Sequence, residues 1–224
     1  MRRPEPWFVV AEVVLRPLLA LWFNWRFEGM EHIPRRGPVL IACNHMSVFD
    51  PLAHAYMMVK AGRRPRFLAK SELFASAFLR AVLKGAGQIP VYRGTGSAEP
   101  LEAAKRALRE GEAVLLYPEG TVTGNPDFLP MAAKTGVARL ALACNLPVVP
   151  VAVWGSQYVW RRGGARNLAF GRPITLRAGA PLDFSELSSG AEDPGTLRKV
   201  TDRVMEDLTR LVRGLRGRYP SRWR

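Results

Sequence analysis

Short apolar runs alternate with helical patterns along most of this chain, and this alternation constrains the fold more than any other feature. The runs are rich in β-branched and aromatic residues and are bounded by Gly, Pro or Asn, which is typical of strands. We predict strands at 38–44, 66–69, 88–92, 113–117, 147–153 and 168–174. Helical patterns occupy 72–84, 98–110, 131–144 and 195–213. The order predicts a single α/β domain with a mixed, largely parallel sheet flanked by helices.

The strand at 38–44 leads directly into a segment that carries His45 and Asp50. A carboxylate can accept the proton on one imidazole nitrogen, fix the tautomer, and leave the other nitrogen able to take a proton. The pair therefore has what a general base needs. Taken alone, the same segment fits an ordinary turn with a hydrogen-bonded histidine equally well.

Other chemically capable residues also follow predicted strands, where α/β sheets place their ligands. Lys70 closes the strand at 66–69, and Arg93 follows the strand at 88–92 in a glycine-flanked loop. A guanidinium suits bidentate phosphate recognition, although a solvated surface arginine is the common alternative.

A second strand end, after 113–117, carries Glu119, Gly120 and Thr121. Gly120 permits close approach of the backbone to a ligand, and Glu119 could accept hydrogen bonds from a polyol. The two prolines of the apolar run 146–151 suggest an edge strand or a strand start, because proline cannot donate to the sheet.

The charge balance points to an anionic partner. Thirty-three Lys and Arg residues against 19 Asp and Glu give a net charge of +14. A membrane surface, a phosphorylated small molecule or nucleic acid would each fit this charge. Cys43 and Cys144 lie far apart in apolar contexts, which predicts reduced core residues and a cytoplasm-facing location.

Residues 7–27 are apolar enough to suggest a membrane segment, but Glu12, Arg16 and Pro17 interrupt the run near its middle. We predict one helix, or two short ones, lying in the membrane interface, with packing on the protein's own core as the alternative. The expected organisation is a membrane-associating helical segment at 1–30 and a catalytic domain at 31–224 with a basic tail.

Four ordered blocks carry a resemblance to a known family. They are the His45 to Asp50 segment, the run Gly-Gln-Ile-Pro-Val-Tyr that ends at Arg93, the run Tyr-Pro-Glu-Gly-Thr at 117–121, and Leu-Pro-Val-Val-Pro-Val at 146–151. Together they resemble the glycerolipid acyltransferase family, and within it the bacterial 1-acyl-sn-glycerol-3-phosphate acyltransferases.

The resemblance implies acyl transfer from acyl-CoA or acyl-carrier protein, as co-substrate, to the free hydroxyl of lysophosphatidate, giving phosphatidate. It implies no other cofactor, no metal and no covalent nucleophile. His45 would be the general base and Asp50 its orienting partner. The implied substrate-binding residues are Lys70 and Arg93 for the phosphate, Glu119 and Gly120 for the glycerol portion, and Thr121 beside them. The implied place is the cytoplasmic face of the cell membrane, against anionic lipids, with no nucleic acid partner.

One residue departs from the family pattern. The third block of the family usually continues Glu-Gly-Thr-Arg-Ser, whereas here Val122 follows Thr121. This leaves open whether the acceptor is lysophosphatidate or another lysophospholipid or a glycolipid. Lys134, or the cluster of Arg161, Arg162 and Arg166, could supply the missing charge.

Three alternative hypotheses remain. A metal site at His45, Asp50 and His54 would need an unusual ligand spacing. Cys43 could act as an acylated nucleophile, although a small core residue is the simpler interpretation. A non-catalytic module for acidic lipid or nucleic acid would explain the charge, but it does not require the ordered His-Asp and Glu-Gly blocks.

Overall fold

The core of the molecule is a seven-stranded sheet in the order β1-β7-β6-β2-β5-β3-β4. The computed structural model describes residues 6–92, 98–190 and 193–223. The strands are β1 (Asn24–Glu28), β2 (Val39–Cys43), β3 (Pro65–Lys70), β4 (Ile89–Val91), β5 (Ala113–Leu116), β6 (Val148–Trp154) and β7 (Pro173–Ala178). Only the β6–β7 pair is antiparallel among them, so the predicted mixed, largely parallel sheet is confirmed.

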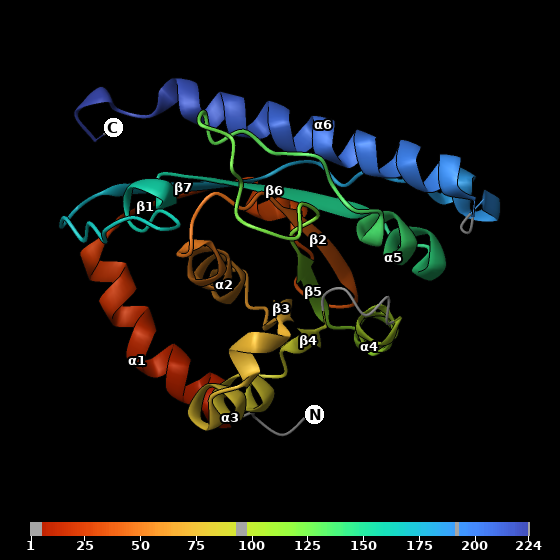
Figure 1. The fold of residues 1–224 in the computed structure, drawn as a ribbon, viewed down its shortest axis with the longest axis horizontal. Helices are drawn as coiled ribbons and strands as arrows, with labels where there is room; N and C mark the ends of the chain where they lie inside the picture. Colours follow the sequence, from red (N-terminus) through yellow and green to blue (C-terminus); the bar gives the residue numbers. More distant parts are fainter. Residues whose placement is uncertain (1–5, 93–97, 191–192, 224) are drawn as a thin grey trace.

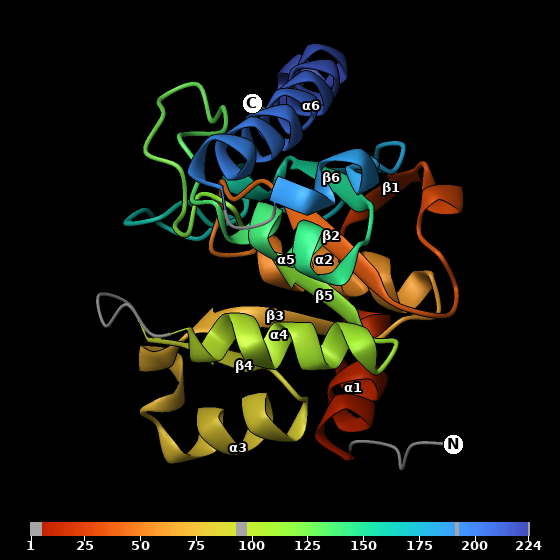
Figure 2. The ribbon, with the colours of Figure 1, turned by 90° about the vertical axis from the view of Figure 1, so that its right-hand side faces the viewer.

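Helices cover both faces of the sheet (Figures 1 and 2). They are α1 (Pro6–Trp22), α2 (Asp50–Lys60), α3 (Ala77–Gly85), α4 (Glu99–Arg109), α5 (Gly136–Cys144) and α6 (Pro194–Arg218). Short 3-10 helices lie at η1 (Met30–His32), η2 (Ser71–Phe74), η3 (Ser156–Tyr158), η4 (Ser185–Gly190) and η5 (Ser221–Trp223).

The central strand β2 is buried on both faces, which explains its uninterrupted apolar sequence. Side chains of a strand alternate between faces. Ile41 accordingly packs with Met57 of α2 on one side. Leu40 packs with Leu108 of α4 and Leu208 of α6 on the other. β2 is thereby held between two apolar layers, so its carboxyl end is a rigid support for whatever follows it.

The N-terminal prediction was partly wrong. The helix expected at 7–27 ends at Trp22, and residues 24–28 form β1, which pairs in parallel with β7 at the sheet edge. Trp25 and Phe27 alternate with polar neighbours and pack against the core, as a strand with one buried face requires. Across the residues described, no helix is both long enough and apolar enough to cross a membrane.

Several other boundaries differ from the predictions. The strand expected at 168–174 begins only at Pro173, because the preceding backbone turns to bond the start of β1, with Arg172 accepting from Asn24. The helix expected at 131–144 begins at Gly136, and the segment 72–84 is divided between η2 and α3. The basic tail, expected to leave the helical region at Arg213, continues α6 to Arg218.

The two prolines of the run 146–151 do not mark an edge strand: Pro147 lies just before β6 begins at Val148, and Pro150 lies within β6. β6 lies inside the sheet between β2 and β7, and all of its residues are buried. The carbonyl of Pro150 accepts from Gly179 just beyond the β6–β7 register, which starts at Val151. The regular pairing is interrupted here and resumes at the bridge between Val148 and Leu182, so the missing N–H of Pro150 falls at an irregular position of the antiparallel pair.

Candidate active site

The structure brings His45 and Asp50 into direct contact. His45 follows the last residue of β2, and Asp50 is the first residue of α2. Nδ1 of His45 lies 2.9 Å from Oδ2 of Asp50. The Asp50 side chain is fully buried, whereas 15% of the His45 side chain is exposed. The pair thus has a buried carboxylate behind a ring that solvent or a substrate can reach.

Further donors surround the Asp50 carboxylate. The backbone N–H groups of Met46 and Ser47 donate to Oδ2 at 2.6 and 2.8 Å. The hydroxyl of Ser156 donates to Oδ1 at 2.5 Å. A backbone N–H group can only donate, so Oδ2, which faces two of them, presents lone pairs. It therefore accepts a hydrogen bond from the ring as well. Nδ1 of His45 therefore carries the proton and Nε2 presents a lone pair.

The His45 ring is also held by an aromatic stack. It lies on the Tyr117 ring at a centroid distance of 4.1 Å and an interplanar angle of 20°. The Tyr117 hydroxyl in turn contacts Nδ1 of His54 at 3.1 Å. Burial lowers the pKa of His54 to about 4, so this second imidazole is neutral at physiological pH. In the described part of the chain, no protein group bonds Nε2 of His45.

Glu119 links two loops through backbone hydrogen bonds. Its Oε1 accepts from the backbone N–H of His45 at 3.1 Å, and its Oε2 accepts from that of Met131 at 2.9 Å. Burial raises the pKa of Glu119 to about 6, although both N–H groups oppose the shift. The carboxylate expected to face a polyol is thus engaged by backbone, and it fixes the position of His45.

The next two residues present a small surface beside this bridge. Gly120 has φ +69°, a left-handed conformation that disfavours other residues. A Cβ built on Gly120 would lie 3.6 Å from Cε of Lys134. The hydroxyl of Thr121 accepts from Nη1 of Arg162 at 3.3 Å. Two of the basic residues proposed to compensate for Val122 therefore reach this segment.

Of the two remaining predicted binding residues, the structure describes only Lys70. Lys70 ends β3, and its amine pairs with Oε1 of Glu72 at 2.9 Å. Arg93 lies outside the described residues, so its predicted role stays a prediction.

The structure does not favour the other sequence hypotheses for this region. Cys43 is fully buried among the side chains packed on α2, and burial raises the pKa of its thiol well above the usual value. A buried, protonated thiol is a poor nucleophile. Over the described residues, no group of three His, Cys, Asp or Glu side chains has the arrangement of a metal site.

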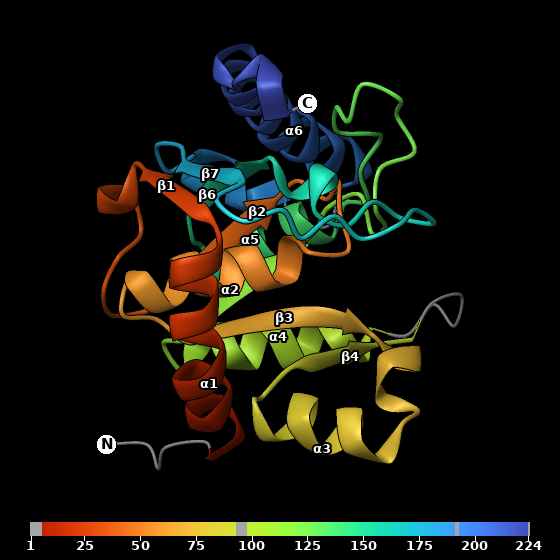
Figure 3. The ribbon, with the colours of Figure 1, turned by 90° about the vertical axis from the view of Figure 1, so that its left-hand side faces the viewer.

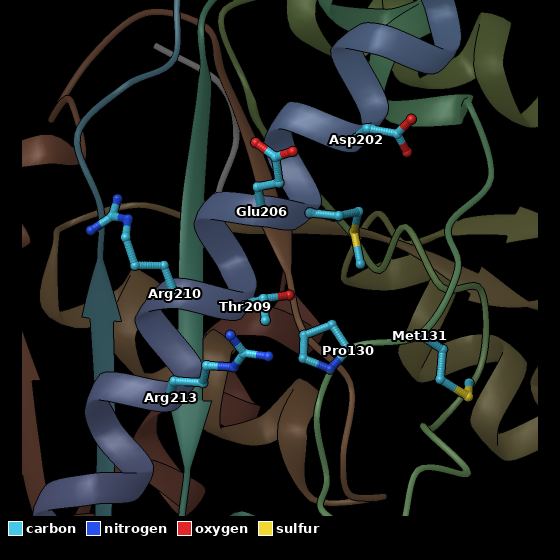
Figure 4. Close-up of a pocket in the computed structure, with 8 residues that line it drawn as sticks. Pro130, Met131, Asp202, Glu206, Thr209, Arg210 and Arg213 are labelled. Carbon is cyan, nitrogen blue, oxygen red and sulfur yellow. The ribbon is translucent and has the colours of Figure 1, made fainter.

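A pocket of about 560 Å³ lies elsewhere, between α6 and the loop at Pro130 and Met131 (Figure 4). The other lining residues belong to α6: Asp202, Met205, Glu206, Thr209, Arg210 and Arg213. None of the predicted site residues lines it. Its walls mix acidic and basic side chains, so its charge selects no ligand.

Sequence reasoning missed two residues that hold the site together. Ser156 follows β6 and donates to Asp50, and Tyr117 follows β5 and stacks on His45. Both stand directly beyond strands whose carboxyl ends meet β2 in the sheet. Glu119 was predicted because polar residues just beyond a strand end are candidate site residues. The same rule applied to β6 would also have selected Ser156.

The fold is a largely parallel α/β sheet, and a His-Asp contact lies at the carboxyl end of its central strand β2. The family model described as Acyltransferase matches residues 24–154, and the chain belongs to this acyltransferase family.

Named relatives agree with this assignment. The chain is 26% identical to the 1-acyl-sn-glycerol-3-phosphate acyltransferase of Bacillus subtilis, over 86% of this chain and 92% of that protein. It is 30% identical to the enzyme of that name from Borreliella burgdorferi, over 80% of this chain and 70% of the relative. It spans 58% of a Limnanthes alba relative of the same name, at 28% identity.

A solved structure shares the fold. The 1-acyl-sn-glycerophosphate (LPA) acyltransferase PlsC from Thermotoga maritima superposes with a TM-score of 0.71 at 24% identity. The match covers 99% of this chain and 86% of that one. The whole described chain, including β1 and α6, therefore follows one established architecture.

Proposed function

We propose that this protein transfers an acyl group from acyl-CoA or acyl-carrier protein to the free hydroxyl of 1-acylglycerol-3-phosphate, giving phosphatidate. The observation that carries the proposal is the His45–Asp50 contact, which leaves Nε2 of His45 as the available base. The names of the Bacillus and Borreliella relatives support the choice of acceptor.

The chemistry follows from the protonation states. Nε2 of His45 takes the proton of the acceptor hydroxyl as the oxygen attacks the thioester carbonyl. The resulting imidazolium is stabilised by the buried Asp50 carboxylate, whose position is fixed by its other donors. As the tetrahedral intermediate collapses, the C–S bond breaks and the thiolate receives the proton from His45. A thioester is already activated, so alignment and deprotonation of the alcohol suffice.

The test follows thiol release from palmitoyl-CoA in the presence of lysophosphatidate. We expect His45→Ala to lower kcat by at least roughly a hundredfold, the range that a general base contributes. Lys199→Ala, an exposed change on α6, serves as the matched control and should keep full activity. Circular dichroism establishes that both variants fold.

Two outcomes would contradict the proposal. One is thiol release that never exceeds the no-protein rate with any of several lysophospholipid acceptors. The other is a His45→Ala protein that retains most of the activity. Replacing palmitoyl-CoA by palmitoyl-acyl-carrier protein in the same assay decides which donor is used.

The second part of the proposal places the protein on the cytoplasmic face of the cell membrane. Figure 3 shows α1 passing along one side of the molecule, with its N-terminal part beside α3. Both helices expose large apolar side chains: Val13, Val14, Leu18 and Leu21 on α1, and Phe78 and Leu79 on α3. Trp22 extends this surface by an edge contact with Phe170, which is also exposed. Exposed apolar helices beside basic residues are suited to an interface with anionic lipids.

Vesicle flotation tests this placement. Wild-type protein should float with vesicles of phosphatidylcholine and phosphatidylglycerol, and a Leu18→Asp, Leu21→Asp variant should remain in the dense fractions. Ser188→Asp adds a like charge on η4, which contacts α5 and α6 and lies away from α1. If the α1 variant and this control float equally well, α1 is not the membrane contact, and another surface of the protein binds the vesicles.

A further inference from the structure

Two basic side chains from separate parts of the chain converge on the Gly120-Thr121 segment. Lys134 lies near the end of the long loop that follows the segment, and its Cε and Nζ would lie 3.6 and 3.9 Å from a Cβ built on Gly120. Arg162 comes from the loop after η3, and its Nη1 donates to Thr121 at 3.3 Å. Both side chains are largely exposed, so a ligand can reach them.

The segment that they flank is bonded to the catalytic histidine on both sides. Glu119, immediately before it, accepts from the backbone N–H of His45 at 3.1 Å. Thr123, just after it, donates its backbone N–H to the carbonyl of His45 at 2.7 Å. An anion that bound both cations would therefore lie against the loop that holds the base.

Neighbouring basic residues lie over aromatic rings, whereas Lys134 and Arg162 are directed at the segment. The guanidinium of Arg161 lies over the Phe128 ring at 5.3 Å, and that of Arg166 lies over the Trp160 ring at 4.1 Å. Lys134 and Arg162 form no ion pair with any residue that the structure describes. Glu119, the carboxylate immediately before the segment, accepts from the backbone N–H groups of His45 and Met131. A cation without an anionic partner attracts an anion, so each of the two can bind a negatively charged group that reaches the segment.

We propose that Lys134 and Arg162 form a phosphate-binding subsite that holds the phosphomonoester of the acceptor beside His45. The inference rests on the proposed function for the identity of that acceptor. A phosphomonoester carries close to two negative charges at neutral pH and matches one ammonium and one guanidinium. The segment itself supplies no cation, because Val122 follows Thr121. Acceptor selection thus depends on residues distant in sequence.

Steady-state kinetics on the full chain test the subsite. The variants are Lys134→Met, Arg162→Gln and the double variant, with Lys199→Met and Arg139→Gln as controls that remove the same charges from exposed positions on α6 and α5. We expect each single site variant to raise the KM for lysophosphatidate about tenfold, the value of one charge-assisted contact, and the double variant to raise it about a hundredfold. The kcat and the KM for palmitoyl-CoA should stay at the wild-type values, and the controls should match wild type.

Three kinetic results would overturn the subsite. An unchanged lysophosphatidate KM removes both residues from acceptor binding. An equal rise in the controls reduces the effect to bulk charge. A rise in the palmitoyl-CoA KM instead would show that the cations hold the phosphates of the donor.

A binding measurement separates this inference from the proposed function. Equilibrium binding of a fluorescent lysophosphatidate to His45→Ala protein requires no turnover. Weaker binding when Lys134→Met and Arg162→Gln are added to that background supports the subsite even if no acceptor is turned over. If these two substitutions leave lysophosphatidate binding unchanged, the subsite is contradicted even if the wild-type enzyme is fully active.

Discussion

Glu119 should make the stability of this protein fall as the pH rises, which is the reverse of the usual behaviour of a carboxyl group. Burial raises the pKa of Glu119 from 4.5 to about 6. Between these two values the folded protein holds a proton on Glu119 that the unfolded chain releases. The associated stability is therefore fully present below pH 4.5 and is lost as the pH rises through 6. A shift of this size corresponds to about 2 kcal/mol.

The perturbation is Glu119→Gln, which keeps the shape of the side chain and removes its titration. Glutamine can accept only one of the two backbone hydrogen bonds. The free energy of unfolding of the variant is therefore lower by about 1–3 kcal/mol at every pH. The quantity of interest is the free energy of unfolding of wild type minus that of the variant. It should decrease by about 2 kcal/mol between acid and neutral pH.

Urea denaturation of both proteins at a series of pH values across this window measures the difference, because other titrating groups cancel. Glu102→Gln is the control with the opposite sign. The hydrogen bond from Lys105 lowers the pKa of the exposed Glu102. Any stability that wild type has over Glu102→Gln should therefore be lost as the pH falls. If the free energy of unfolding of wild type minus that of Glu119→Gln stays constant or grows as the pH rises, the argument that desolvation dominates at this site is refuted.

Two further substitutions test how the site and the sheet are held. Ser156→Ala removes the donor to Oδ1 of Asp50 and should lower kcat about tenfold with little change in either KM. A change in KM alone would show that Ser156 acts on substrate binding instead. Gly155→Ala would place a Cβ 2.4 Å from the carbonyl oxygen of Pro173 at φ +104°, and should reduce the free energy of unfolding by about 3 kcal/mol or more. Gly163→Ala has a similar φ of +68° with nothing within 4 Å and should cost about 1 kcal/mol, so equal urea midpoints for the two variants would contradict the steric argument.

The sequence predicted the parts of the fold that depend on local pattern. β2, β5 and β6 are short, apolar and bounded by turn residues, and they form the buried centre of the sheet. β1 escaped prediction because residues 24–28 continue an aromatic and apolar stretch that began in a helix. Only the pairing with β7, far along the chain, decides that this stretch is extended.

The same distinction holds for the active site. His45 and Asp50 are close in sequence, so their contact could be anticipated from the turn that joins a strand to a helix. Glu119 was found by its place at a strand end, but its bonds to two backbone N–H groups depend on a loop closure that no local pattern records. Ser156 reaches Asp50 from 106 positions away. Its hydroxyl gives no sequence signal beyond its place after β6.

The edge position of β1 has a consequence for how the chain is made. His32, just beyond β1, contacts the carbonyl of Ala178 at the end of β7, 146 positions further on. At ribosomal rates this separation corresponds to on the order of ten seconds between the emergence of β1 and that of its partner. During this interval the apolar side chains of α1 and β1 lack part of the surface against which they pack in the folded protein. Once β7 has emerged, its open edge is a template for pairing with other chains until β1 returns to cover it.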